Sequence, residues 1–393
     1  MSVNYRSIYP LSQKSQYSEN DNIDFVLSLD NEKLVPGSVT LEGEAAIFTT
    51  GTTKVDGPDR IYYEPRVGYH GIIRNLTTTF QNLGIVEQLT DYPRLVKMRG
   101  LATKYDNEYG SQTDTCVEGR VPTKKMAKGM AEGLTYSVNR GNTTPQSYVP
   151  FSLKLENSLN KANAPISSAV TGQIRLQIRL SPNQEFLFGE DLTANTNYKV
   201  QNLKLRYITI PDDGSRNPIQ MERYSSFRAL IDSNNQNIST FVPGGLADSV
   251  HMSFISLANE QDATQNYILC SPPPGIPPLG VSQDVAPDSY GLERVTYAIN
   301  DTDTALVGWT LESREEIVRN GIRSFNPSTQ QFSALIRHMR DPQFPDGYIA
   351  GIPFGGLMNL QQNKFACELE SQVTNATQYA AYLYFRIVDT FEG

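Results

Sequence analysis

The chain has 393 residues, which is enough for two domains of ordinary size that each bury a core of their own. Its formal net charge of −8 argues against a nucleic-acid groove over much of the surface, because phosphate binding needs clustered Lys and Arg. Only 39 % of the residues are apolar. The composition is typical of strands joined by many turns and disfavours a mainly helical enzyme, because it includes 23 prolines, 28 glycines, 21 tyrosines and 16 phenylalanines.

The first half of the chain reads as a polar arm followed by a domain made of strands. Residues 1–22 are polar and predict an extended N-terminal arm. Alternation of apolar and polar residues then begins at Ile23 and marks the start of a domain over 23–211. Pro93 favours the first turn of a helix, whereas 106–147 show no sustained period and are expected to be a loop insertion. The strands expected in this domain are 23–29, 38–43, 72–80, 85–89, 148–155, 173–180 and 198–210.

The second half follows the same scheme after a turn at 211–214, which predicts a second domain over 212–393. Ser313 and Glu316 have the spacing of a capping box at the start of a helix predicted over 312–325. The connection at 270–290 holds six prolines, so it is expected to run over the surface or to rest on another subunit. Strands are expected at 227–231, 250–257, 292–300, 305–311, 365–370 and 379–388.

An internal repeat links the two halves. Residues 71–105 and 291–325 each predict a strand, a polar turn, a second strand and a short charged helix. At a constant offset of 220, five identities occur over 29 columns, and the order of elements is stronger support than the letters. The identical pairs are Gly71 with Gly291, Arg74 with Arg294, Thr90 with Thr310, Arg94 with Arg314 and Arg99 with Arg319.

These observations predict one fold class. About eight strands per half, long inter-strand loops and one helix after the middle strand pair are typical of a jelly-roll sandwich. The expected fold is therefore all-β, with two tandem eight-stranded jelly-roll sandwiches (a double jelly roll) and one short helix in each.

The sequence also bears on the compartment. The first 25 residues are polar, so no signal peptide is expected, and no run of about 18 apolar residues predicts a membrane span. Cys116, Cys270 and Cys367 are odd in number and widely spaced, which argues against a disulfide framework and fits a reducing compartment.

Several segments resemble a known family. Residues 291–301, with 306–310 and the helix after them, look like the C-terminal jelly roll of double jelly-roll major capsid proteins. The ending, from 351–354 through 365–369 to 379–385, is similar as well. The opening, with Tyr9-Pro10, 23–25 and 36–39, resembles smaller capsid proteins of that lineage. The lineage includes tailless bacteriophages, adenoviruses, virophages and polinton-like viruses.

The resemblance implies a function in the virion. It suggests a homotrimer in which six similar jelly rolls form a pseudo-hexagonal capsomer, and such capsomers tile an icosahedral shell. The implied partners are further copies of the chain, with penton, minor capsid or cement proteins beside them and an internal membrane as an open possibility. No cofactor and no enzymatic activity are expected.

Catalytic and metal signals are weak. His70, His251 and His338 are isolated from one another and from cysteine in sequence, so each is interpreted as structural. No short motif of nucleophilic catalysis, metalloprotease or nucleotide binding is present, and no catalytic, cofactor-binding or metal-binding residue is predicted. The oxygen-rich turn at 300–303 lacks the other ligands of a calcium loop and favours a hairpin, while the basic cluster at 124–128 favours a solvated loop tip over a nucleic-acid contact.

Two other functions stay open at this point. One is a minor or vertex capsid protein whose second half is a spike, for which a pentamer is expected. The other is a carbohydrate-binding β-sandwich protein, for which a cluster of aromatic and acidic side chains is expected.

Overall fold

The first sandwich has two layers of strands that face each other across a common core. One layer has the order β3-β12-β8-β9, and the other has the order β1-β14-β5-β10, with the short strands β2, β4, β6 and β11 at its margins. The main strands are β1 (Asn4–Ile8), β3 (Asn22–Leu27), β5 (Thr40–Thr50), β8 (Ile73–Phe80), β9 (Gly84–Leu89), β10 (Val149–Lys154), β12 (Ile174–Leu180) and β14 (Asn197–Pro211). The short ones are β2 (Gln16–Tyr17), β4 (Glu32–Leu34), β6 (Thr53–Lys54), β7 (Tyr62–Tyr63), β11 (Ile166–Ser167) and β13 (Leu187–Phe188).

These features come from a computed structural model of the chain. It describes residues 3–50, 53–54, 62–63, 67–103, 118, 148–188, 193–216, 218–260, 292–301, 304–326, 349–371 and 378–391. Most of the predicted insertion at 106–147, the proline-rich connection, the basic cluster, His338, Cys116 and Cys270 lie outside these residues.

The second sandwich has the same connectivity as the first. Its layers have the orders β15-β22-β17-β20 and β16-β21-β18-β19. Taken in chain order, its eight strands correspond one to one to eight strands of the first sandwich, namely β1, β3, β5, β8, β9, β10, β12 and β14. They are β15 (Ile219–Ile231), β16 (Asn235–Thr240), β17 (Leu246–Ser256), β18 (Leu292–Asp301), β19 (Thr304–Leu311), β20 (Ala350–Met358), β21 (Lys364–Ser371) and β22 (Tyr379–Phe391).

The helix of each sandwich lies at the same point of the connectivity. Helix α1 (Tyr92–Thr103) follows β9, and α6 (Arg314–Arg323) follows β19. Adding 220 to the first residue of α1 gives position 312, two residues before α6 begins. The predicted internal repeat therefore corresponds to equivalent elements of two jelly rolls. Short turns of helix complete the chain: η1 (Gly68–Ile72), η4 (Ser158–Asn160), α3 (Ser168–Thr171), α4 (Asn183–Phe186) and α5 (Leu257–Glu260).

The predicted fold class is confirmed, and several element bounds differ from the prediction. Residues 4–8, expected in an extended arm, form β1, whose partner is β14 of the same chain. Strand β15 begins at Ile219, well before the expected 227, and β16 and β20 were not predicted. Polar residues occupy much of β16 and glycine recurs in β20, so neither segment has the apolar alternation that marks a strand.

The core follows the alternation of the strands. In β12, the side chains of Ile174, Leu176, Ile178 and Leu180 are buried and the residues between them are not fully buried. A strand with this pattern presents one apolar face to the opposite layer. Each fully buried side chain of this kind contributes about 1.5–3 kcal/mol relative to an exposed one. The two sandwiches have separate hydrophobic clusters, and the cluster of the first extends to residues of β15 and β22.

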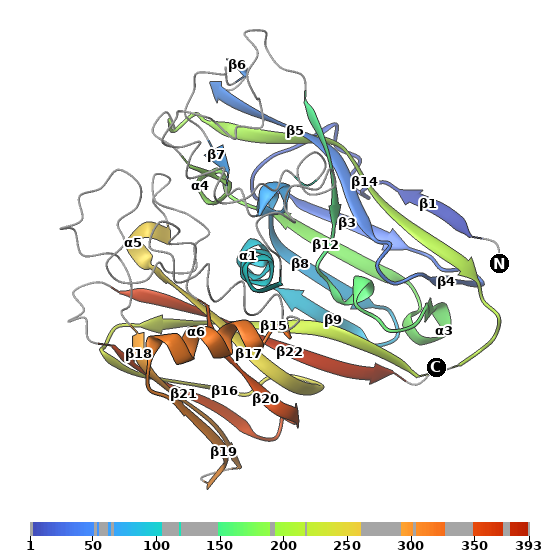
Figure 1. Cartoon of the computed structure of the whole chain (residues 1–393). Coiled ribbons are helices and arrows are strands. Elements are labelled where there is room, and N and C mark those ends of the chain that lie inside the picture. The colour runs from blue at the N-terminus through green and yellow to red at the C-terminus, as the bar shows by residue number, and fades with distance from the viewer. Residues whose placement is uncertain are drawn as a thin grey trace.

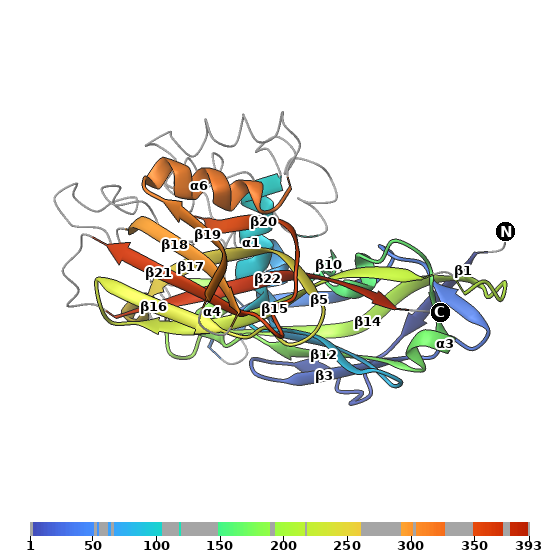
Figure 2. The same ribbon diagram turned by 90° about the horizontal axis from the view of Figure 1, so that it is seen from below.

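The two sandwiches are joined into a single block. Strand β9 of the first sandwich lies parallel to β15 of the second and pairs with it at Gln88 and Ser225. This contact makes one continuous sheet from β3 to β20. Helix α1 lies between the sandwiches and contacts α6, as Figure 1 shows, and Figure 2 gives the view along the joined layers. Among the described residues, no helix is long and apolar enough to cross a membrane.

Candidate functional site

The seam between the two sandwiches is held by polar side chains. Glu87 of β9 is fully buried and accepts hydrogen bonds from the backbone N–H of Ser158 (2.8 Å) and of Tyr224 (3.1 Å). Beside it, the Ser226 hydroxyl accepts a hydrogen bond from the backbone N–H of Thr90 at 3.0 Å. Strands β9 and β15 pair through backbone at one position, so these side chains satisfy edge groups that would otherwise be buried without a partner. Burial raises the pKa of Glu87.

A second segment of the first sandwich covers the free edge of β15. Ala162 forms an isolated antiparallel bridge with Met221, and the backbone N–H of Asn163 donates to the Gln220 carbonyl at 3.0 Å. Lys161 places its ammonium 4.2 Å from the centre of the Tyr224 ring. Burial lowers the pKa of Lys161 to about 8. The first strand of the second sandwich is thus covered by the first sandwich along much of its length.

The two described histidines, His70 and His251, are both buried. His251 of β17 shares a hydrogen bond with the Ser324 hydroxyl at 2.7 Å, and its ring stacks on Phe325 with centroids 3.7 Å apart. Burial lowers its pKa, so the imidazole is neutral. His70 shares a hydrogen bond of 3.0 Å with the Tyr92 hydroxyl. These contacts fit the interpretation of both residues as structural, since neither ring has access to a substrate.

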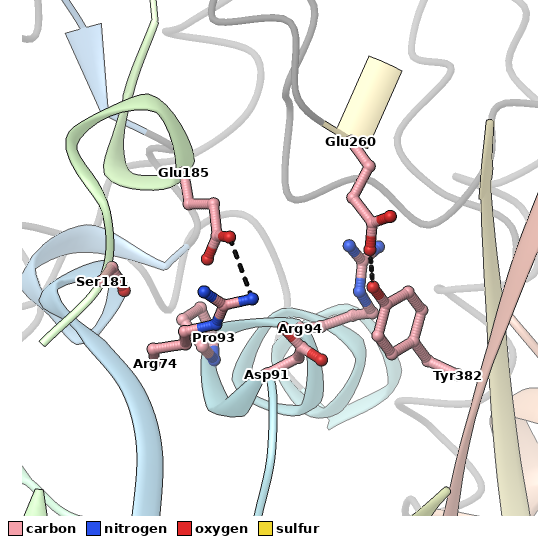
Figure 3. A pocket seen from close by; sticks show the side chains of 8 residues that line it. All are labelled: Arg74, Asp91, Pro93, Arg94, Ser181, Glu185, Glu260 and Tyr382. Carbon is pink, nitrogen blue, oxygen red and sulfur yellow. Dashed lines mark hydrogen bonds and ion pairs between the residues drawn. The ribbon is translucent and has the colours of Figure 1, made fainter. Parts of the chain in front are cut away.

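A small polar pocket lies at the seam, where α1 begins (Figure 3). The Arg74 guanidinium is 3.2 Å from the Glu185 carboxylate. In the second sandwich, the Tyr382 hydroxyl donates a hydrogen bond to the Glu260 carboxylate. The Arg94 guanidinium, which comes from α1 of the first sandwich, lies 4.2 Å above the Tyr382 ring. The pocket is lined by Arg74, Asp91, Pro93, Arg94, Ser181, Glu185, Glu260 and Tyr382.

The pocket is lined mainly by charged side chains from both sandwiches. Burial raises the pKa of Asp91, and it raises the pKa of Glu185 to about 7 although Arg74 favours the ionised form. The cavity has a volume of about 30 Å³, which is room for water and not for a sugar ring. Arginines alternate with the carboxylates, and among the described residues no group of His, Cys, Asp or Glu could hold a metal ion. The pocket therefore couples the two sandwiches electrostatically.

A groove of about 630 Å³ with both polar and apolar lining residues lies beside the seam. Ile85 of β9 is 65 % exposed, and Phe241, in the turn after β16, is 56 % exposed. Phe227 of β15 adds a third exposed apolar side chain, and Gln88 and Ser225 line the floor. Exposed apolar surface of this kind in a soluble protein often marks a contact site.

The other residues singled out in the sequence have structural places. Ser313 accepts a hydrogen bond from the backbone N–H of Glu316 at 3.2 Å, so its predicted place as the helix cap is confirmed. The Glu316 carboxylate accepts a hydrogen bond at 3.1 Å from the backbone N–H of Glu312, the residue before the cap, and not from that of Ser313 as a capping box requires. Cys367 is buried in the second core, where burial raises the pKa of its thiol. Asn300 and Asp301 end β18, which pairs with β19 as a hairpin, and residues 302–303 lie outside the described residues.

The residues of the seam were missed because their sequence pattern is misleading. The register between β8 and β9 shifts beside Glu87, between Thr78 and Thr79. That irregularity buries Val86 beside Glu87 and leaves Ile85 exposed, so the apolar residues of β9 do not alternate regularly. Asp91 lies directly before α1 with a positive φ of 50°.

Comparison with solved structures identifies the fold. The Faustovirus major capsid protein superposes with a TM-score of 0.63 at 10 % identity, covering 100 % of this chain and 90 % of that one. The crystal structure of PBCV-1 VP54, fitted into a reconstruction of the virophage Sputnik, gives 0.58 at 10 % identity over 100 % and 95 %.

The chain has the double jelly-roll fold. A structure of the Sputnik virophage also matches, with a TM-score of 0.53, 11 % identity and coverage of 99 % and 85 %. No protein-family model matches the sequence, and no curated protein sequence matches it. At this level of identity, the double jelly-roll likeness concerns the fold.

Proposed function

We propose that this double jelly-roll chain is a structural protein of a viral shell, a major capsid protein located in the virion and without catalytic activity. The observation that carries the proposal is the exact repetition of one eight-strand plan, with a helix at the same point in each copy. The likeness to capsid proteins supports it, because it covers this whole chain and 90–95 % of the two capsid proteins compared.

The doubled plan has a geometric use in a shell. Three chains that each carry two similar sandwiches can form a ring of six similar units. Such a pseudo-hexagonal block packs in a plane through one kind of contact, so homotrimeric capsomers can tile an icosahedral shell. The chain's main partner is then itself, with neighbouring capsomers, penton proteins and minor or cement proteins around it.

The seam supports this function over an enzymatic one. Glu87, the Lys161–Tyr224 contact and the Arg94–Tyr382 contact fix the two sandwiches to each other through buried groups. A shell component needs such rigidity, because an angle error between sandwiches would be repeated in every block. The small volume of the polar pocket gives no room for a substrate.

Light scattering on the purified chain tests the proposal. We expect one species with three times the 43.8 kDa of a single chain. A chain that stays monomeric at high concentration contradicts the proposal. A pentamer contradicts the capsomer function and favours the vertex protein instead.

A further inference from the structure

The seam inside the chain is a template for the contact between chains. At the seam, the fifth strand of one sandwich, β9, lies parallel to the first strand of the next, β15. The helix that follows β9, α1, contacts the second sandwich through Arg94 and Tyr382. A six-membered ring built from three chains has three such seams inside chains and needs three more between chains. If the six units are to be related by similar rotations, the same two kinds of strand must meet at both kinds of seam.

The strands left for the second kind of seam are β19 and β1. They are the fifth strand of the second sandwich and the first strand of the first sandwich. Within the described part of the chain, β19 pairs with β18 alone and β1 pairs with β14 alone, so each presents one open backbone edge. Figure 1 shows the two strands at opposite ends of the block, as a head-to-tail ring requires.

We propose that β19 of one subunit lies alongside β1 of the next and closes the trimer. This inference rests on the proposed function, and it names the interface that the trimer uses. The contact is heterologous, since one edge meets a different edge, and three such contacts close a ring. Helix α6 takes at this contact the place that α1 has at the internal seam.

The exposed side chains at the two edges support this assignment. Tyr5 of β1 is 75 % exposed and Tyr9 is 69 % exposed, while Met221 and Tyr224 of the corresponding strand β15 are buried and belong to the hydrophobic cluster of the first sandwich. Within the described ranges, β1 therefore lacks the cover that β15 has. With Tyr5 and Tyr9, the exposed large apolar residues of this end are Val3 and Leu11.

Strand β19 lacks the charges and the proline that often protect an open edge, and its one irregularity of register lies near its start, between Ala305 and Val307. Edge strands of soluble proteins usually carry charges, proline or a bulge that prevents pairing with other chains. The sequence of β19, TALVGWTL, contains no charged residue and no proline. Thr310 and Gly308 are exposed and small, so another backbone can approach closely. Thr310 also stands 220 positions after Thr90, which bonds across the internal seam to Ser226.

Cysteine cross-linking tests the interface. In a background with Cys116→Ser and Cys270→Ser, we place Ser7→Cys on β1 and Thr310→Cys on β19, both at exposed positions. Light scattering first gives the oligomeric state of each variant. We then add a short bismaleimide and read the products on a denaturing gel. The matched control pairs Ser7→Cys with Gln361→Cys, which is exposed in the turn between β20 and β21.

The expected products follow from a head-to-tail ring. The double variant should give covalently closed trimers, two co-expressed single variants should give cross-linked dimers, and either single variant alone should give monomers. A trimer in solution with no cross-linking above the control overturns the β19–β1 interface and leaves the proposed function standing. A monomer in the parent protein overturns both.

A charge pair provides a second readout that does not depend on thiol reactivity. Thr310→Lys should dissociate the trimer at concentrations where the parent is fully trimeric, because it adds a charge to the buried edge. Adding Ser7→Glu to the same chain should restore the trimer. A Thr310→Lys variant as trimeric as the parent contradicts the inference, even if the thiols at Ser7→Cys and Thr310→Cys fail to react.

Discussion

Replacing Glu87 by Ala should weaken the whole block and not the first sandwich alone. The substitution removes the acceptor of two buried backbone N–H groups, those of Ser158 at 2.8 Å and Tyr224 at 3.1 Å, one from each sandwich. Each buried donor left without a partner costs about 1–3 kcal/mol, so the free energy of unfolding should fall by roughly 2–6 kcal/mol. A Glu87→Gln variant keeps one acceptor oxygen and should lose about half of that amount.

The single tryptophan makes this effect measurable in the distant sandwich. Trp309 lies in β19 of the second sandwich, and its ring contacts Phe354 at 5.8 Å between centroids. Urea unfolding followed by Trp309 fluorescence at fixed protein concentration should show the Glu87→Ala transition at lower denaturant. The control is Asp24→Ala, which removes an exposed ion pair with Arg175 and should change stability by less than about 1 kcal/mol. Equal midpoints for Glu87→Ala and the control would refute the coupling.

Three further predictions concern other contacts of the block. Gly321→Ala should lower the melting temperature despite the helix preference of Ala, because the added Cβ would lie 2.3 Å from the Ile349 carbonyl oxygen; an unchanged or raised value in a thermal scan contradicts this. Burial raises the pKa of Glu185 from 4.5 to about 7, so between these pH values the folded chain keeps a proton that the unfolded chain loses. The free energy of unfolding should therefore fall by roughly 3 kcal/mol as the pH rises from 4.5 to about 7. A pH series of urea titrations should show this slope, and Glu185→Gln should flatten it. Tyr384→Phe removes a hydrogen bond of 3.0 Å from the Tyr384 hydroxyl to the Asp91 carbonyl, so the free energy of unfolding should fall by about 1 kcal/mol in the same urea assay. An unchanged free energy of unfolding would contradict a closed seam at this contact.

The fold was predictable because its strongest signals are local. Alternation in β12, the helix cap at Ser313 and the repeated order of strand, strand and helix are each visible within a few residues of sequence. They identify a strand, a helix start and a duplicated unit without reference to distant contacts. Together they were enough to predict two tandem jelly rolls, and the resemblance to a known family added the expected function in a shell.

The seam was not predictable for a physical reason. Its residues come from β8, β9, α1, α4, α5, β15 and β22, and only the folded chain brings them together. Glu87 faces inward opposite the buried Thr78, and a charged residue in a strand otherwise reads as solvent-facing. Strand β1 was hidden for the opposite reason, since its exposed Tyr5 and Arg6 break the pattern of a buried strand.

Electron microscopy of the purified oligomer tests the central claim most directly. Averaged images viewed along the symmetry axis should show a hexagonal outline with six similar lobes, two from each chain. Three lobes of unequal shape, a fivefold outline or isolated two-lobed particles would contradict the claim that one sandwich plan is repeated so that three chains form a six-sided block.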